Sequence, residues 1–304
     1  MLNKNPAPNT VPPLSTWDDQ GIVSSLDSEV FTTPPALTHA ELVHLRVRVI
    51  ALENLVVALL AEGSERQREV APGGTEQEAH RLGRRVTAHA RNGQSVMDCV
   101  EAGIDWIMHA DFMDERQADR LAASGIPCCP ALTFTANIVD WGHIAGCSQA
   151  RIDRFRRDLD KAVKNLSYAH RNGVKMMCGT DTGFAVTPYG EWHAREPELF
   201  VKLLGMSPLE AITCATRNSA VTVDGGNLGT LETGKLADLL VVDGDPLAEI
   251  RILQDRERLH AIYLGGQAID RTPQPPMHRW PWERSLQISE REIYQSTVRE
   301  HAAA

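Results

Sequence analysis

Apolar residues recur at helical spacing in residues 38–71, which we expect to form one amphipathic helix. Thr38 and Glu41 have the spacing of a capping box, in which each side chain accepts a hydrogen bond from a free backbone N–H at the helix start. The apolar seam of this helix consists of Leu42, Leu45, Val49, Leu52, Val56 and Leu59. This apolar face must be covered, either by the domain that follows or by a second copy of the chain.

Residues 75–226 carry a different pattern, in which amphipathic stretches alternate with short apolar runs. The amphipathic stretches predict helices at 76–82, 94–101, 114–124 and 149–171. A glycine follows each helix, and the next apolar runs predict strands at 85–88, 104–108, 126–132 and 174–178. Repeated helix–strand units predict an α/β fold with a parallel sheet, and strands that are apolar throughout are expected to be buried on both faces.

The other segments divide the chain further. Ser207-Pro-Leu-Glu210 combines an N-cap, a proline at the first helical position and a capping glutamate, and so predicts a helix running to about residue 220. Residues 227–271 are expected to form strands with tight turns. Residues 1–37 are rich in proline and are expected to be a disordered arm, and residues 272–304 form a polar tail whose later part could be helical.

Composition and charge narrow the possible functions. The 304 residues are 42% hydrophobic and 23% charged, which is enough for a sizeable core. The net charge of −9 argues against a nucleic acid or an anionic membrane as partner, since both need basic patches. No apolar run is long enough to cross a bilayer. The six cysteines form no CxxC pair and the amino terminus has no secretory pattern, so we expect a cytoplasmic protein.

Two histidines and one aspartate stand where chemistry is expected. His89 and His109 directly follow the first two predicted strands, and Asp181 follows the fourth. Because the carboxyl ends of parallel strands open onto one crevice, we expect the three side chains to meet there. Two imidazoles and a carboxylate are a usual ligand set for zinc or a similar divalent ion. A single histidine at a strand end is more often structural, so the hypothesis rests on the three together.

The segment 182–196 would lie at the mouth of that crevice. Tyr189, Trp192 and His193 could bind the substrate there, and the alternative is that these side chains pack within a surface loop. Trp141 and His143, which come after the third predicted strand, are weaker candidates.

Three motifs contain the candidate residues: Val86-Thr-Ala-His89-Ala, Gly103-Ile-Asp-Trp-Ile-Met-His109 and Gly173-Val-Lys-Met-Met-Cys-Gly-Thr-Asp181-Thr-Gly. They resemble the fifth, sixth and eighth strand signatures of the amidohydrolase superfamily. The segments from Gly205 to Ala220 and from Gly229 to Pro246 are similar to its carboxy-terminal motifs. The nearest branch contains imidazolonepropionase-like, Xaa-Pro dipeptidase-like and phenylurea hydrolase-like enzymes.

The resemblance implies an incomplete TIM-type (β/α) barrel, with strands equivalent to 5–8 and a partial β-sandwich after it. It implies a metal-dependent hydrolase of C–N bonds in a small amide, urea, carbamate or dipeptide, with one or two zinc ions, or iron, cobalt or manganese instead. His89 and His109 would be metal ligands. Asp181 would be both a metal ligand and the general base for the water molecule that attacks the carbonyl. The expected partners are this substrate and a second copy of the chain.

The sequence departs from the family pattern in one respect. The family carries a His-x-His pair on its first strand and a bridging lysine on its fourth, whereas no His-x-His occurs here and the only lysine before Thr75 is Lys4. At most three protein ligands remain, which is enough for one catalytic ion. The alternative is therefore a catalytically inactive, amidohydrolase-like protein retained for an oligomeric or interaction role. A nucleotide-binding α/β protein is disfavoured, because no GxGxxG or GxxxxGK[ST] loop follows a strand.

Overall fold

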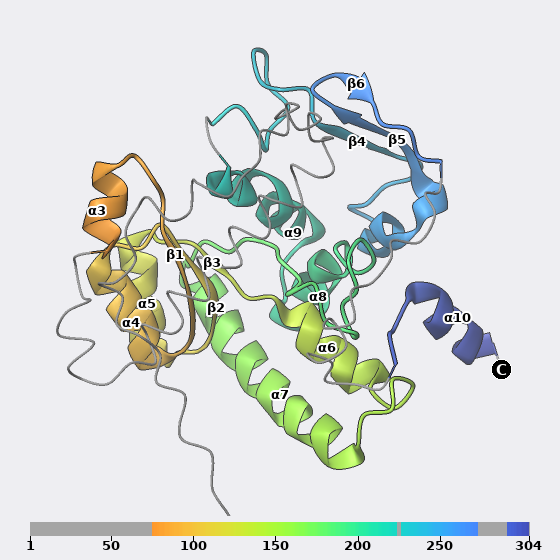
Figure 1. Ribbon diagram of the computed structural model, residues 1–304, viewed down its shortest axis with the longest axis horizontal. Coiled ribbons are helices and arrows are strands. Elements are labelled where there is room, and N and C mark those ends of the chain that lie inside the picture. The colour runs from red at the N-terminus through yellow and green to blue at the C-terminus, as the bar shows by residue number, and fades with distance from the viewer. Residues whose placement is uncertain (1–74, 224–225, 273–290, 304) are drawn as a thin grey trace, which may run out of the picture. The chain divides into compact units, whose positions relative to one another are not determined.

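The computed structural model describes residues 75–223, 226–272 and 291–303 (Figure 1). The predicted arm at 1–37 and the predicted helix at 38–71 lie outside the described residues.

The described part begins with helices and strands in alternation. Its elements are α3 (Thr75–Arg81), β1 (Thr87–Asn92), α4 (Gly93–Ala102), β2 (Trp106–Phe112), α5 (Glu115–Ser124) and β3 (Cys128–Cys129). The three strands pair in parallel in the order β1-β2-β3, and Met176 adds a single parallel bridge to Cys128. The α/β class and the parallel sheet are thus as the sequence predicts.

The first two strands begin later and extend further than the sequence predicts. Strands β1 and β2 begin two residues later than expected and run beyond the apolar segments, so that His89 and His109 lie within them. The ladder continues through polar residues to the pair Asn92–Phe112, with a register shift after Ala90. Apolar runs mark only the buried part of a strand, whereas backbone pairing continues to the open end of the sheet. The expected strand 174–178 is reduced to the bridge at Met176.

Helices cover the sheet and complete the core. The long helix α7 (Gln149–Arg171) has the predicted bounds and packs against α5, α6 and β2 (Figure 1). Asp114 and Gln117 form a capping box at the start of α5, and Gly125 ends that helix in a left-handed conformation. The core beneath these elements includes Ile107 of β2 and Leu166 of α7, both fully buried.

Two helices lie where the sequence predicts none. Helix α6 (Leu132–Trp141) replaces the end of the expected strand 126–132, and α8 (Arg195–Leu204) begins at the end of the predicted mouth segment. Most of α6 is buried on every side, so it lacks the one-sided apolar pattern by which an amphipathic helix is identified.

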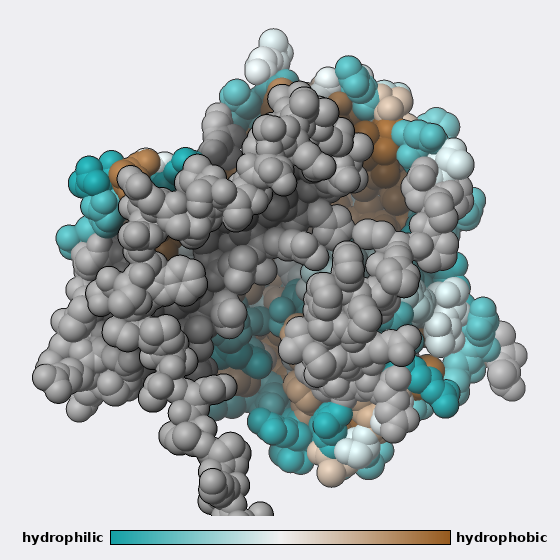
Figure 2. All heavy atoms as spheres, in the orientation of Figure 1, coloured by the Kyte–Doolittle hydropathy of each residue, from teal (hydrophilic) through white to brown (hydrophobic). Residues whose placement is uncertain are grey.

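The second half of the described chain contains a small antiparallel sheet. Helix α9 (Pro208–Thr213) has the predicted Ser207–Glu210 capping box, but its α-helical part ends before residue 220 and continues as the π-helix η2 (Cys214–Asn218) and the 3₁₀-helix η3 (Ser219–Thr222). Strands β4 (Leu239–Val242), β5 (Leu259–Leu264) and β6 (Gln267–Ala268) then pair in order, with the 3₁₀-helices η4 (Ile250–Gln254) and η5 (Arg256–Arg258) between β4 and β5. Leu240 and Val241 are exposed on this sheet, and Figure 2 shows hydrophobic surface over the same region.

The carboxy-terminal segment packs back onto the segment that follows Asp181. Helix α10 (Gln295–Ala303) is preceded by Ile293, which is fully buried in a cluster with Phe134, Ile138 and Trp192. The Trp192 indole Nε1–H donates to the Ile293 carbonyl at 2.8 Å, and the Ile293 N–H donates to the Ala185 carbonyl at 2.9 Å.

The structure also bears on the cysteines and on the possibility of a membrane-spanning helix. Within the described ranges, all six cysteines are free and most are buried. None of the helices in this part of the chain combines the length and the apolar character that crossing a bilayer requires.

Replacing Ile293 with Ala should lower the free energy of unfolding by about 3 kcal/mol, because it leaves a cavity among fully buried neighbours. Urea unfolding followed by circular dichroism measures this change. Leu231→Ala is the matched control, since Leu231 is 80% exposed and its loss should cost less than about 0.5 kcal/mol. Equal effects of the two substitutions would contradict the packing described for Ile293.

Candidate functional site

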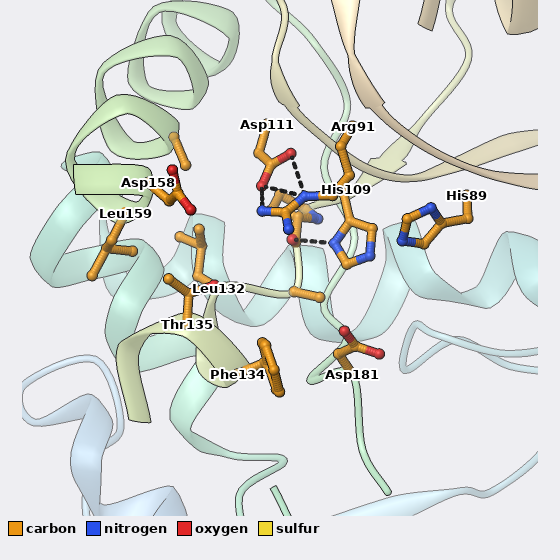
Figure 3. Close-up of a pocket in the computed structure, with 13 residues that line it drawn as sticks. His89, Arg91, His109, Asp111, Leu132, Phe134, Thr135, Asp158, Leu159 and Asp181 are labelled. Atoms are coloured by element: carbon orange, nitrogen blue, oxygen red, sulfur yellow. Dashed lines mark hydrogen bonds and ion pairs between the residues drawn. The ribbon is translucent and has the colours of Figure 1, made fainter. Parts of the chain in front are cut away.

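A pocket with about 410 Å³ of empty space, part of it open to solvent, lies at the carboxyl end of the parallel sheet. Its polar wall comes from β1, β2, α7 and the segment after Met176. Its apolar wall comes from the start of α6, from the connection before that helix, and from α7 (Figure 3). The ionisable residues that line it are His89, Arg91, His109, Asp111, Asp158 and Asp181.

The two predicted histidines lie beside each other. Their ring centroids are 4.5 Å apart with an interplanar angle of 76°, His109 buried and His89 exposed (Figure 3). The His109 Nδ1 atom lies 3.2 Å from the Pro130 carbonyl oxygen. A carbonyl can only accept, so Nδ1 carries the proton and Nε2 keeps its lone pair for a ligand. Burial lowers the pKa of His109, against the charge of Asp181, and so favours the neutral imidazole that binds metals.

Asp181 lines the same pocket from the segment after Met176, and Figure 3 shows its carboxylate on the side of the two imidazoles. The structure therefore brings the three predicted residues to one pocket. Within the residues that the structure describes, no group of three or more His, Cys, Asp or Glu side chains is arranged so that it could hold an ion by itself. The two histidines and Asp181 therefore share one pocket without forming a complete metal site by themselves.

Backbone strain is concentrated at this pocket. In the described ranges, the non-glycine residues with positive φ are His109 (73°), Ala110 (58°), Ala131 (55°) and Asp181 (50°). Three of them line the pocket, and Ala110 joins His109 to Asp111. Each left-handed residue of this kind costs about 1 kcal/mol or more and persists only where its surroundings hold it. Such clustering is typical of functional sites.

Arg91 and Asp111 form an ion pair that the sequence reading missed. The Arg91 Nε–H donates to both Asp111 oxygens, at 3.1 and 3.2 Å, and its Nη2 makes a further short contact. Asp111 is buried, and the guanidinium also lies 4.7 Å from the Phe112 ring centroid. The pair joins β1 to β2 directly beyond the two histidines. Its sequence signal was the spacing, since each residue stands two positions after a candidate histidine.

The three predicted substrate-binding residues lie outside this pocket's lining. Tyr189 is 62% exposed, whereas Trp192 is buried against Trp141, with ring centroids 4.7 Å apart. The Gly190 N–H donates to His193 Nε2, so His193 Nδ1 carries the proton and lies 3.2 Å from the Thr180 hydroxyl. A role of these residues in binding substrate stays a prediction.

A buried carboxylate, Glu196 of α8, supports the apolar wall of the pocket. It accepts hydrogen bonds from the backbone N–H groups of Leu132 and Thr133, both at 2.8 Å, and from the Thr133 hydroxyl at 2.5 Å. Burial raises the pKa of Glu196 to about 7, against these bonds and the charge of Arg195, which lower it.

Comparisons with known proteins agree with the motifs. A family model described as the amidohydrolase family matches residues 74–269. Ochratoxinase of Aspergillus niger is 28% identical over 193 residues, which cover 63% of this chain and 39% of that protein. Imidazolonepropionase of Solibacter usitatus is 39% identical over 67 residues, or 22% of this chain and 16% of that protein. A solved prolidase, complexed with N-methylphosphonate-L-proline, aligns with a TM-score of 0.56 and 27% identity, over 65% of this chain and 48% of its own. The chain spans less than half the length of each.

Replacing Arg91 with Met should lower the free energy of unfolding by roughly 3 kcal/mol, because it leaves the buried Asp111 carboxylate without its partner. The matched control is Arg120→Met. Arg120 pairs with Glu101 at 3.2 Å on the surface, and its loss should cost less than about 1 kcal/mol. Thermal and urea unfolding of both variants measure the difference. If R91M loses no more free energy of unfolding than R120M does, the buried Asp111 carboxylate does not need Arg91 as its partner.

Glu196 should make the stability depend on pH. Its pKa in the folded chain is raised from 4.5 to about 7, so its contribution is fully present below about pH 4.5 and is lost as the pH rises toward 7. The native chain should therefore lose stability relative to Glu196→Gln over this interval. Urea unfolding at a series of pH values tests this, and a difference that does not change with pH would contradict the raised pKa.

Proposed function

We propose a hydrolytic function from one premise, namely that the chain belongs to the amidohydrolase family. On that premise, its pocket takes part in cleaving a C–N bond of a small amide, urea, carbamate or dipeptide substrate. The observation that carries the proposal is the meeting of His89, His109 and Asp181 at the carboxyl end of a parallel sheet, where enzymes of this architecture bind their substrates.

The kinds of donor in the pocket, imidazole and carboxylate, are those that divalent cations take as ligands. His89 and His109 offer two neighbouring imidazoles, and the Pro130 carbonyl fixes the His109 tautomer in the way that hydrogen-bonded backbone carbonyls do for metal-binding histidines. These two residues would hold the ion with Asp181, and zinc is the cation that we propose, with iron, cobalt and manganese as alternatives. When bound, such an ion lowers the pKa of water toward neutrality and polarises a carbonyl.

Asp181 is the proposed general base. Its carboxylate is exposed to the pocket, and the Thr187 hydroxyl donates to its backbone carbonyl at 2.9 Å, which helps to hold the left-handed backbone that aims the side chain. It would take a proton from the attacking water molecule and deliver it to the departing nitrogen. Leu132, Phe134 and Leu159 line the pocket beside it and would exclude bulk water from the reacting bond.

The fold proposal follows from the same premise. Strands β1, β2 and β3 and the bridge at Met176 would be consecutive strands of an incomplete (β/α) barrel, equivalent to strands 5–8, and β4–β6 would be part of a β-sandwich. The proposed ligands are two imidazoles and one carboxylate, and the family's His-x-His does not occur in this sequence. We therefore propose one ion per chain rather than a bridged pair.

Replacing His109 with Ala should abolish binding of Co²⁺ or Zn²⁺ and any hydrolysis, because the better oriented of the two imidazoles is lost. Equilibrium dialysis against each ion measures binding, and a panel of amide, urea, carbamate and Xaa-Pro dipeptide substrates measures hydrolysis. His143→Ala is the control, since His143 is exposed, lies outside the pocket lining and should leave both unchanged.

The alternative, a catalytically inactive protein, gives the opposite outcome. It predicts that the native chain binds essentially no ion after loading and that His109→Ala changes only the stability. Asp181→Asn separates the two proposed roles of Asp181, since loss of a base lowers hydrolysis more than it lowers ion binding.

A further inference from the structure

We propose that Glu196 is a positioning residue that holds His109 in place through the amino terminus of α6. The proposal rests on the function proposed above for His109. It assigns a task to a fully buried carboxylate that neither lines the pocket nor forms a salt bridge there.

Helix α6 begins without a cap of its own. Its N-cap residue is Ala131, whose side chain cannot accept a hydrogen bond and whose backbone is left-handed at φ 55° and ψ 50°. A side-chain cap ordinarily needs an extended backbone at this position. The conformation that places Ala131 in the pocket wall is therefore incompatible with an ordinary local cap, and the first N–H groups of the helix need a partner from elsewhere.

Glu196 supplies that partner from α8, more than sixty residues away. Its two oxygens accept from Leu132 N–H and Thr133 N–H, and the Thr133 hydroxyl adds a third bond. In its ionised form, the Glu196 carboxylate also interacts favourably with the positive end of the helix dipole, and more strongly in a buried environment. The hydrogen bonds fix the position of residues 132 and 133 although Ala131 itself is strained.

The capped segment is the one that orients His109. The Pro130 carbonyl, which accepts from His109 Nδ1 at 3.2 Å, is only two residues before Leu132. Only the φ and ψ rotations of Ala131 separate the peptide plane of this carbonyl from that of the capped Leu132 N–H, so the direction of the carbonyl depends on few rotations. Loosening the cap should therefore let the carbonyl move and leave the imidazole free to turn.

The test compares Co²⁺ binding by full-length variants. Glu196→Gln puts an amide donor against one of two N–H donors, and should weaken Co²⁺ binding about tenfold or more and change the visible absorption of the bound ion. Thr133→Val, which keeps the shape but removes the hydroxyl, should act in the same direction with a smaller effect. Thr133→Ser keeps the hydroxyl and should restore native binding.

Glu198→Gln is the matched control on the same helix. Glu198 accepts from Gln254 Nε2 at 2.8 Å and pairs with Arg251 at 3.6 Å, away from α6. This variant should change stability but leave Co²⁺ affinity and its spectrum as in the native chain. Native affinity in a folded Glu196→Gln chain would overturn the proposal. If that variant does not fold, native affinity in Thr133→Val would do so.

A second measurement needs no metal. Long-range ¹H–¹⁵N spectra of His109 should show the Nδ1–H tautomer in the native chain and a mixture of tautomers in Thr133→Val and Glu196→Gln. An unchanged tautomer in these variants would overturn the positioning role even if the native chain binds no ion. Absence of Co²⁺ binding by the native chain, with the expected tautomer shift in the variants, would instead reject the proposed function and retain the role of Glu196.

Discussion

The site depends on the parallel pairing of β1 with β2. In this register Ala90 lies opposite His109 and His89 lies opposite Met108, so the two imidazoles come from adjacent positions on neighbouring strands. Parallel strands point their carboxyl ends to the same edge, and residues twenty apart in sequence therefore become neighbours there. The Arg91–Asp111 pair repeats the same cross-strand contact two residues further on. Backbone pairing thus brings the charged groups together before any ligand is bound.

That arrangement is strained, and distant elements hold it. Three left-handed residues, His109, Ala131 and Asp181, line the pocket. Two of these positions are held by side chains from further along the chain: Glu196 accepts from the first N–H groups of α6, next to Ala131, and the Thr187 hydroxyl donates to the Asp181 carbonyl. Local propensity would relax these turns. The pocket therefore depends on tertiary contacts made by α8 and by the segment after Asp181, although neither of them is a strand of the parallel sheet.

The contrast between local pattern and contacts from distant segments explains which features the sequence could predict. The bounds of α7 and the grouping of His89, His109 and Asp181 followed from local periodicity and from the rule that parallel strand ends converge. Helix α6 could not be identified, because it is buried on nearly every side and its cap comes from a residue far along the chain. The partner of Arg91 was also hidden, since it depends on the register of two strands. The motifs identified the family, whose known pattern then supplied roles that periodicity cannot.

The charges of the pocket give a further reason for a cation there. Asp111, Asp158 and Asp181 line the pocket; Asp111 pairs with Arg91 and Asp158 lies 4.0 Å from Arg154, while burial favours the neutral form of His109. Carboxylates gathered in a partly enclosed pocket repel one another unless a positive charge offsets them. With Asp111 engaged by Arg91 and Asp158 near Arg154, the charge of Asp181 remains on the side of the two histidines. The cation that we propose at the two imidazoles would balance that charge.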